Sequence, residues 1–201
     1  MRLNINLKKL RRKSKMYKGS IQEAFDLGYK QGLLGEGFYK GKHIYRFYRI
    51  DKTGYYRLDF SNVRTNSRML QAIILEMSKK FKATFYIVGQ RVKKPQGAYP
   101  RIQFWENDMP EKFSVYFHLE EGCVYIENAC AQPLPTPIPY CSMGIAGCAI
   151  VIDELGENQY RFNCNDADRD DDFDDLIFDL SVVEFSDGQE WLKEAKTKPE
   201  N

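Results

Sequence analysis

Hydrophobic and polar residues alternate along most of the chain, which is the pattern of β-strands that bury one face. The alternating runs are bounded by Gly, Pro, Asn and Asp, residues that favour turns. The segments predicted as strands are 43–50, 55–63, 83–89, 101–106, 113–119, 122–127, 147–153, 159–164 and 176–185. The four residues at 51–54, Asp-Lys-Thr-Gly, have the composition of a hairpin turn, so we expect the first two strands to pair.

A few segments have the features of helices instead. Ser20 followed by Glu23 is a capping box, so a helix should begin there and end near 32–34. Residues 66–82 carry apolar side chains at helical spacing, which predicts a second helix. Residues 191–201 should form a short helix. The predicted fold is therefore α+β, with an antiparallel sheet packed by one or two helices and followed by a small all-β acidic region.

The formal net charge of +2 hides an asymmetric distribution of charge. Residues 1–130 contain 25 Lys and Arg against 12 Asp and Glu, whereas residues 131–201 contain 5 against 16. This polarity predicts either a basic and an acidic partner surface or two halves that attract each other. The sign changes where alternate Pro residues favour an extended linker. The predicted division is a basic arm at 1–18, an α+β domain at 19–130, a Pro-rich linker at 131–140 and an acidic all-β region with a charged tail at 141–201.

The first 18 residues contain eight basic residues and no acidic one. Such a segment is either a solvated terminus or an arm that contacts phosphates or an acidic protein. In the strand predicted at 43–50, two Arg lie among Tyr and Phe, which can stack on bases or simply form the polar face of a half-buried strand. The candidate contacts to nucleic acid or a partner are Lys8, Lys9, Arg11, Arg12, Lys13, Lys15, Arg46 and Arg49.

Eight Asp lie among the seventeen residues from 163 to 179, between two predicted strands. Carboxylates at this density repel one another unless a cation or a basic group neutralises them. Ca²⁺ is bound by about six to eight oxygen atoms in flexible geometry, so Ca²⁺ is the expected cofactor. An acidic surface turn and a docking surface for Lys and Arg are the alternatives. The candidate metal ligands are Asp166, Asp168, Asp170, Asp172, Asp174 and Asp175.

Part of this acidic run resembles a known motif. Asp170 to Phe178 is similar to the D-x-D-F-N-D-L-V-F segment of the LruC-like β-modules of exported and surface proteins, with Asp174 where that family usually has Asn. The resemblance implies that Asp170, Asp172, Asp174 and Asp175 bind Ca²⁺, and that Phe173, Leu176 and Phe178 pack inward. It covers one short segment and does not extend into residues 1–130.

Catalytic chemistry has little support in the sequence. The separations between Cys123, Cys130, Cys141, Cys148 and Cys164 match no zinc pattern, and buried thiols are the simpler interpretation. Ser142 lacks the G-x-S-x-G context of a hydrolase nucleophile, and no nucleotide-binding fingerprint is present. We therefore predict no catalytic residue and no enzymatic activity.

These features predict a non-catalytic structural or assembly protein, such as a phage or virion component, which contacts protein neighbours. The alternatives are a nucleic-acid-binding accessory protein that uses the basic arm, and an immunity or anti-defence inhibitor that uses the Asp cluster as a phosphate mimic. No membrane span and no secretory signal are expected, because no sufficiently long apolar stretch is present. Cytoplasmic synthesis followed by release in a virion would reconcile this with a Ca²⁺ site that works outside cells.

Overall fold

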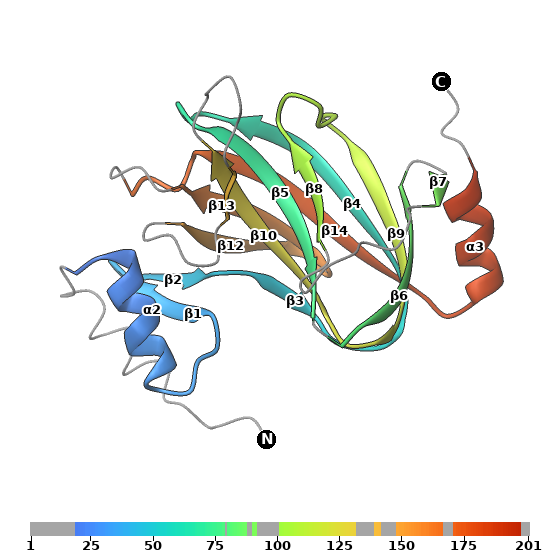
Figure 1. Cartoon of the computed structure of the whole chain (residues 1–201), viewed down its shortest axis with the longest axis horizontal. Coiled ribbons are helices and arrows are strands. Elements are labelled where there is room, and N and C mark those ends of the chain that lie inside the picture. The colour runs from blue at the N-terminus through green and yellow to red at the C-terminus, as the bar shows by residue number, and fades with distance from the viewer. Residues whose placement is uncertain are drawn as a thin grey trace.

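The computed structural model describes residues 19–78, 80–87, 90–91, 101–131, 139–141, 148–166 and 171–197, with 90–91 and 139–141 as backbone only. Two antiparallel sheets pack face to face (Figure 1). The larger sheet contains, in spatial order, β1 (Glu36–Tyr39), β2 (Lys42–Tyr45), β12 (Ala149–Gly156), β13 (Gln159–Asn165), β14 (Leu176–Phe185), β4 (Gly54–Thr65), β9 (Phe113–Glu121), β6 (Lys82–Ile87) and β7 (Gln90–Arg91). The smaller sheet contains β11 (Pro139–Cys141), β10 (Val124–Ala131), β5 (Leu70–Met77) and β8 (Arg101–Trp105), with β3 (Tyr48–Ile50) also paired to β10.

The fold is all-β, so the predicted α+β class is wrong. The segment 66–82, predicted as a helix, contains β5, which lies between β10 and β8 in the smaller sheet. Both faces of β5 are buried, and Ile73 and Ile74 point to opposite faces with no exposed surface. A strand buried on both faces loses its alternation and can resemble a buried helix in sequence.

The predicted hairpin at 51–54 is also wrong. β3 pairs with β10 in the smaller sheet, whereas β4 pairs with β14 and β9 in the larger one. The chain therefore passes from one sheet to the other at this turn. A two-residue hairpin lies earlier, between β1 and β2, where Lys40 and Gly41 both have positive φ, of 45° and 83°. Positive φ at both positions is the geometry that matches the twist of a tight hairpin.

Strands from the two halves of the sequence are interleaved in the larger sheet. β12, β13 and β14 lie between β2 and β4, so strands on either side of the predicted 131–140 linker belong to one sheet. Ion pairs also join the basic half to the acidic half, namely Lys40–Asp171, Lys52–Glu184 and Arg57–Glu194. The two halves of the sequence are thus joined by ion pairs as well as by strand pairing.

Two short helices pack at opposite ends of the molecule (Figure 1). α2 (Ile21–Tyr29) begins at the predicted capping box, since Ser20 Oγ accepts from Glu23 N and the Glu23 carboxylate accepts from Ser20 N. It packs on β1, β2 and β12. α3 (Gly188–Lys196) packs on β4, β9 and β6 of the larger sheet, through Trp191. Neither of these helices is long and apolar enough to cross a membrane.

Candidate functional site

The described part of the acidic run lies between β13 and β14 and contacts the β1–β2 hairpin, on which α2 packs. Asp171 accepts hydrogen bonds from Tyr39 OH at 2.5 Å and from Lys40 Nζ at 3.0 Å. Tyr39 is buried under α2, so these contacts attach the acidic run to the β1–β2 hairpin. The charge of Asp171 is therefore paired with Lys40 within the fold.

Phe173 fixes the acidic run to the same region by packing. Its backbone has a positive φ of 66°, and its side chain is buried with Ile21, Phe25 and Ile44 beneath α2. Lys42 Nζ lies 4.4 Å from the centre of the ring, within range of a cation–π interaction. A bulky residue in the left-handed region is strained, and burial of the phenyl ring offsets this strain.

Asp166 and Asp175 occupy the buried end of the acidic run. Asp166 has no exposed surface, and its Oδ2 accepts from Ser67 Oγ at 2.5 Å and from Gln71 Nε2 at 3.0 Å. Asp175, also buried, accepts from the backbone N of Asp166 at 2.8 Å. Buried carboxylates need such donors, because desolvation without them is costly. The donors on Ser67 and Gln71 come from the region before and at the start of β5.

Asp174 and Asp172 stabilise the turn itself. Asn66 Nδ2 donates to Asp174 Oδ2 at 3.1 Å, and the backbone N of Asn66 donates to the carbonyl of Asp175. Asp172 Oδ1 accepts from the backbone N of Asp174. Sequence reasoning named these carboxylates as metal ligands but gave no sign of the turn at 66–67 that contacts them.

The structure describes four of the six predicted metal ligands. Asp166 is in contact with Asp175, and Asp172 with Asp174, whereas Asp168 and Asp170 lie outside the described residues. Within the described ranges, no group of three or more His, Cys, Asp or Glu side chains has an arrangement that could hold a metal ion. Phe173, Leu176 and Phe178 are buried.

Three buried thiols lie next to the buried carboxylates. Cys130 Sγ on β10 and Cys148 Sγ, just before β12, are 3.9 Å apart. Contact with Cys130 and burial raise the pKa of the Cys148 thiol well above its ordinary value, and the carboxylate of Asp166 contributes in the same direction. Burial likewise raises the pKa of Cys164. Thiols held protonated in this way are poor nucleophiles and poor metal ligands.

A second polar group, which sequence reasoning missed, lies on β1 and β2. His43 Nε2 is 3.0 Å from Glu36 Oε2, and His43 Nδ1 is 2.8 Å from Tyr45 OH. In the neutral ring the carboxylate accepts from Nε2–H, so Nδ1 accepts from the phenol. Phe38 stacks on the imidazole, with ring centres 4.6 Å apart. The register of the β1–β2 hairpin brings these residues together, because it sets Glu36 opposite Tyr45 and Phe38 opposite His43.

This group has the partners of a catalytic relay but not the required acidity. Burial raises the pKa of Tyr45 to about 12, and the nearby carboxylates of Glu36 and Glu154 contribute in the same direction. The phenol therefore stays protonated near neutral pH and acts as a hydrogen-bond donor. A nucleophile or base would need a pKa shifted the other way.

The two predicted Arg contacts lie in different environments. Arg46 is partly buried, its guanidinium 4.4 Å from the Phe25 ring and donating to Gln22 Oε1 at 2.7 Å. Arg49 is exposed and pairs with Asp51 at 3.2 Å. The six predicted basic residues of the arm, from Lys8 to Lys15, lie outside the described residues.

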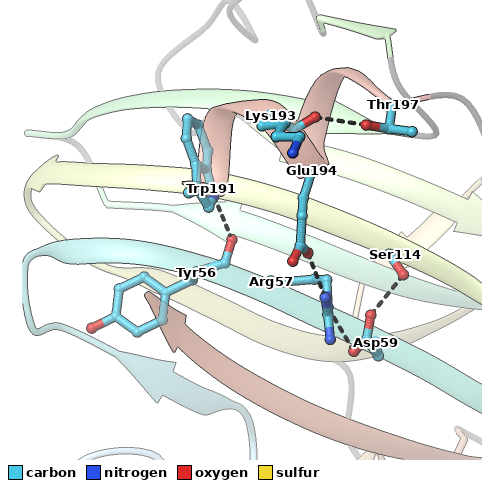
Figure 2. A network of polar contacts seen from close by, with 8 residues as sticks. All are labelled: Tyr56, Arg57, Asp59, Ser114, Trp191, Lys193, Glu194 and Thr197. Atoms are coloured by element: carbon cyan, nitrogen blue, oxygen red, sulfur yellow. Dashed lines mark hydrogen bonds and ion pairs between the residues drawn. The ribbon is translucent and has the colours of Figure 1, made fainter. Parts of the chain in front are cut away.

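A third polar network joins α3 to the sheet (Figure 2). Arg57 on β4 lies between two carboxylates, donating to Asp59 Oδ2 at 2.9 Å and to Glu194 Oε2 at 2.6 Å. Asp59 also accepts from Ser114 Oγ on β9. Trp191 Nε1 donates to the carbonyl of Tyr56 at 3.0 Å. These contacts fix the helix on the sheet and leave the charges paired.

No family model matches the chain, and comparisons with curated proteins and with solved structures find no match. The functional proposals below therefore rest on the geometry of the described residues.

We expect acid sensitivity from Asp179, which lies on the outer face of the larger sheet. Hydrogen bonds from Arg161, at 2.7 and 3.0 Å, lower the pKa of Asp179 against the opposing effect of burial, and Asn62 contributes in the same direction. A lowered folded-state pKa stabilises the fold above the unfolded-state pKa of about 4, and this stabilisation is lost as pH falls through the folded value. As the pH falls below about 4, the melting temperature of Asp179→Asn should therefore fall less steeply than that of the wild type. Parallel acid profiles of the two proteins would contradict this.

Proposed function

We propose that the protein is a non-catalytic assembly component that associates with a second copy of itself through the exposed end of α2. The observation that carries this proposal is the exposure of three large apolar side chains at the end of α2 and in the turn that follows it, Leu27, Tyr29 and Leu34, which we call the α2 patch. These side chains are 40%, 72% and 60% exposed. Grouped apolar side chains that face solvent are a common sign of a protein–protein interface.

The α2 patch is held rigidly, which favours binding because little order has to be gained. Gly28 lies against β1 so closely that a Cβ atom would meet Glu36 O at 2.0 Å. Gly37 on β1 lies against the helix in turn, where a Cβ atom would meet Ala24 O at 2.8 Å. Since this face of the helix is fixed on the hairpin, Leu27 and Tyr29 are directed away from it.

A second copy is a suitable partner because the charges beside the patch are self-complementary. Asp26 and Lys30 are exposed and lie one helical turn apart, on the part of the helix surface between Leu27 and Tyr29. In a two-fold interface, residue i of one copy meets residue j of the other, and the reverse. Two α2 helices packed antiparallel would set Asp26 of each copy against Lys30 of the other. Assembly in a virion is one setting that this proposal fits.

The non-catalytic part of the proposal is supported by the chemistry of the polar groups described above. Cys148 and Cys164 are buried with raised pKa values, and Tyr45 stays protonated at neutral pH. Asp171 and Asp166 accept hydrogen bonds from donors of the fold itself. These groups contribute to stability, and none has the environment of an activated nucleophile.

Sedimentation velocity over a range of protein concentrations tests the proposal. The wild type should form a dimer as concentration rises, and Tyr29→Ser combined with Leu34→Ser should weaken dimerisation at least about tenfold, because each replaces a large apolar contact. Leu155→Ser is the matched control, since Leu155 is 49% exposed but lies near the end of β12. A wild type that stays monomeric, or a patch variant that dimerises as well as the control, would contradict the proposal.

A further inference from the structure

Cys130 and Cys148 bring two thiols into contact between the two sheets. Cys130 lies on β10 of the smaller sheet, and Cys148 lies one position before β12 of the larger sheet. Their Sγ atoms are 3.9 Å apart, and the two residues are buried, with 0% and 2% of their surface exposed. Both thiols are reduced. The chain therefore places a pair of thiols, rather than a lone one, where its two layers meet.

The separation of the two sulfur atoms is within reach of a covalent bond. A disulfide has an S–S length of about 2.0 Å, so the gap to be closed is about 2 Å. Rotation about each Cα–Cβ bond carries the sulfur on a circle, and two such rotations change the separation by this amount. The thiols can therefore be joined while β10 stays paired with β5 and β12 stays paired with β13.

Strand pairing on both sides holds the two thiols near each other. Cys130 is opposite Gln71 of β5, and Ala149, the residue after Cys148, is opposite Asn165 of β13. Two groups fixed in this way react with each other far more readily than with the same groups in solution, because the entropy of bringing them together has already been lost. The fold thus favours a bond within this pair over a bond to another molecule.

Burial slows the reaction of these thiols but favours the bond once it has formed. Contact with Cys130 and burial raise the pKa of the Cys148 thiol, so the reduced pair gains no stability as a thiolate. Stabilisation of the reduced form is what makes some disulfides strongly oxidising, and without it a disulfide resists reduction. The same protonated thiols are poor nucleophiles, so exchange requires the chain to be folding or locally open.

We propose that Cys130 and Cys148 form a disulfide that joins the two sheets when the chain folds or opens in an oxidising environment. The oxidant is a small-molecule disulfide such as glutathione disulfide. The thiolate of one cysteine attacks a sulfur of the oxidant and releases one glutathione, and the second cysteine then attacks the mixed disulfide and releases the other. Two electrons and two protons thus pass from the cysteine pair to two glutathione molecules. In a reducing cytosol the pair stays as thiols.

The bond should stabilise the protein. It would join positions 18 residues apart and close a loop that contains the Pro-rich segment 131–140. Closing such a loop restricts the unfolded chain, so the thermal midpoint of the oxidised protein should lie about 5–10 °C above that of the reduced protein. The proposal uses none of the residues of the α2 patch, so dimerisation and disulfide formation can fail independently.

Oxidative refolding followed by peptide mapping tests the bond. The full chain is refolded from denaturant in a buffer of reduced and oxidised glutathione, and the remaining thiols are then alkylated in denaturant. Mass spectrometry of a non-reduced digest should find peptides joined through Cys130 and Cys148, with the other three of the five cysteines alkylated. Because the chain starts unfolded, slow access to buried thiols cannot explain a missing bond. Five alkylated cysteines, or a linkage through a different pair, would overturn the proposal.

Cys148→Ala and Cys164→Ala form a matched pair of variants. Cys148→Ala should lose both the linked peptides and the rise in the midpoint, whereas Cys164→Ala, which removes another buried thiol on β13, should keep both. An equal rise in oxidised Cys148→Ala would overturn the proposal, since the added stability would then come from elsewhere. If Cys148→Ala fails to fold, melts of the oxidised wild type with and without reductant decide, and identical midpoints would overturn the proposal.

Discussion

Replacing Trp191 with alanine is expected to lower the free energy of unfolding by about 3–5 kcal/mol. The indole is only 3% exposed and packs with Tyr86 and Ala195, with Tyr55 alongside. Its Nε1 donates to the carbonyl of Tyr56 (Figure 2), so the substitution leaves both a cavity and an unsatisfied backbone oxygen. Urea unfolding followed by circular dichroism measures the change.

The conservative substitution separates packing from hydrogen bonding at this position. Trp191→Phe keeps much of the buried ring but removes the donor, so it should cost less than the alanine substitution, on the order of 1–2 kcal/mol. Leu192, which is only partly buried on the same helix, serves as a control position. If Trp191→Ala unfolded at the same urea concentration as the wild type, α3 would not contribute to the fold as described.

Replacing Phe173 with alanine is expected to cost a similar amount, about 3–5 kcal/mol. The ring is buried beneath α2, and its loss would also remove the cation–π contact with Lys42. The measurement should be made in chelator, so that any bound cation does not add to the stability. Trypsin cleavage near Lys30 should then become faster, because α2 loses part of the surface on which it packs.

Asp171→Asn is the matched control, since it changes the neighbouring acidic residue but keeps an oxygen that can accept from Tyr39 OH. Its expected cost is below about 1 kcal/mol, as for most partly exposed ion pairs. A larger loss for Asp171→Asn than for Phe173→Ala would show that charge, rather than packing, holds the acidic run against the hairpin. The Asp171 ion pair would then contribute more to stability than the packing of Phe173.

Most strands could be predicted from the sequence because their burial is one-sided. β9 has the burial pattern of strict alternation, and its position was predicted to within a few residues. β5 could not be recognised, since its two buried faces erase the period that distinguishes a strand from a helix. The start of α2 was also predictable, because Ser20 and Glu23 form the capping box through contacts only three positions apart.

The candidate sites depended much more on the tertiary structure. The Asp-rich composition was visible at once, but the partners of Asp166 are Ser67 and Gln71, which lie 99 and 95 positions away. The pairing of Glu36 with His43 and Tyr45 required the register of the β1–β2 hairpin, which the sequence did not predict. Contacts between residues so far apart leave no periodic pattern in the sequence, so the spacing of residues along the chain does not predict them.

By itself, the sequence determined where most strands lie, where α2 begins, and that opposite charges are divided between the two halves of the chain. The cause is local, since backbone caps and one-sided burial act over a few neighbouring residues. The tertiary structure alone decided which strands pair, that the two halves interleave in one sheet, and that acidic side chains are turned toward donors of the fold. Those outcomes depend on the burial of whole faces and on hydrogen bonds between distant residues, which form only when the two sheets pack.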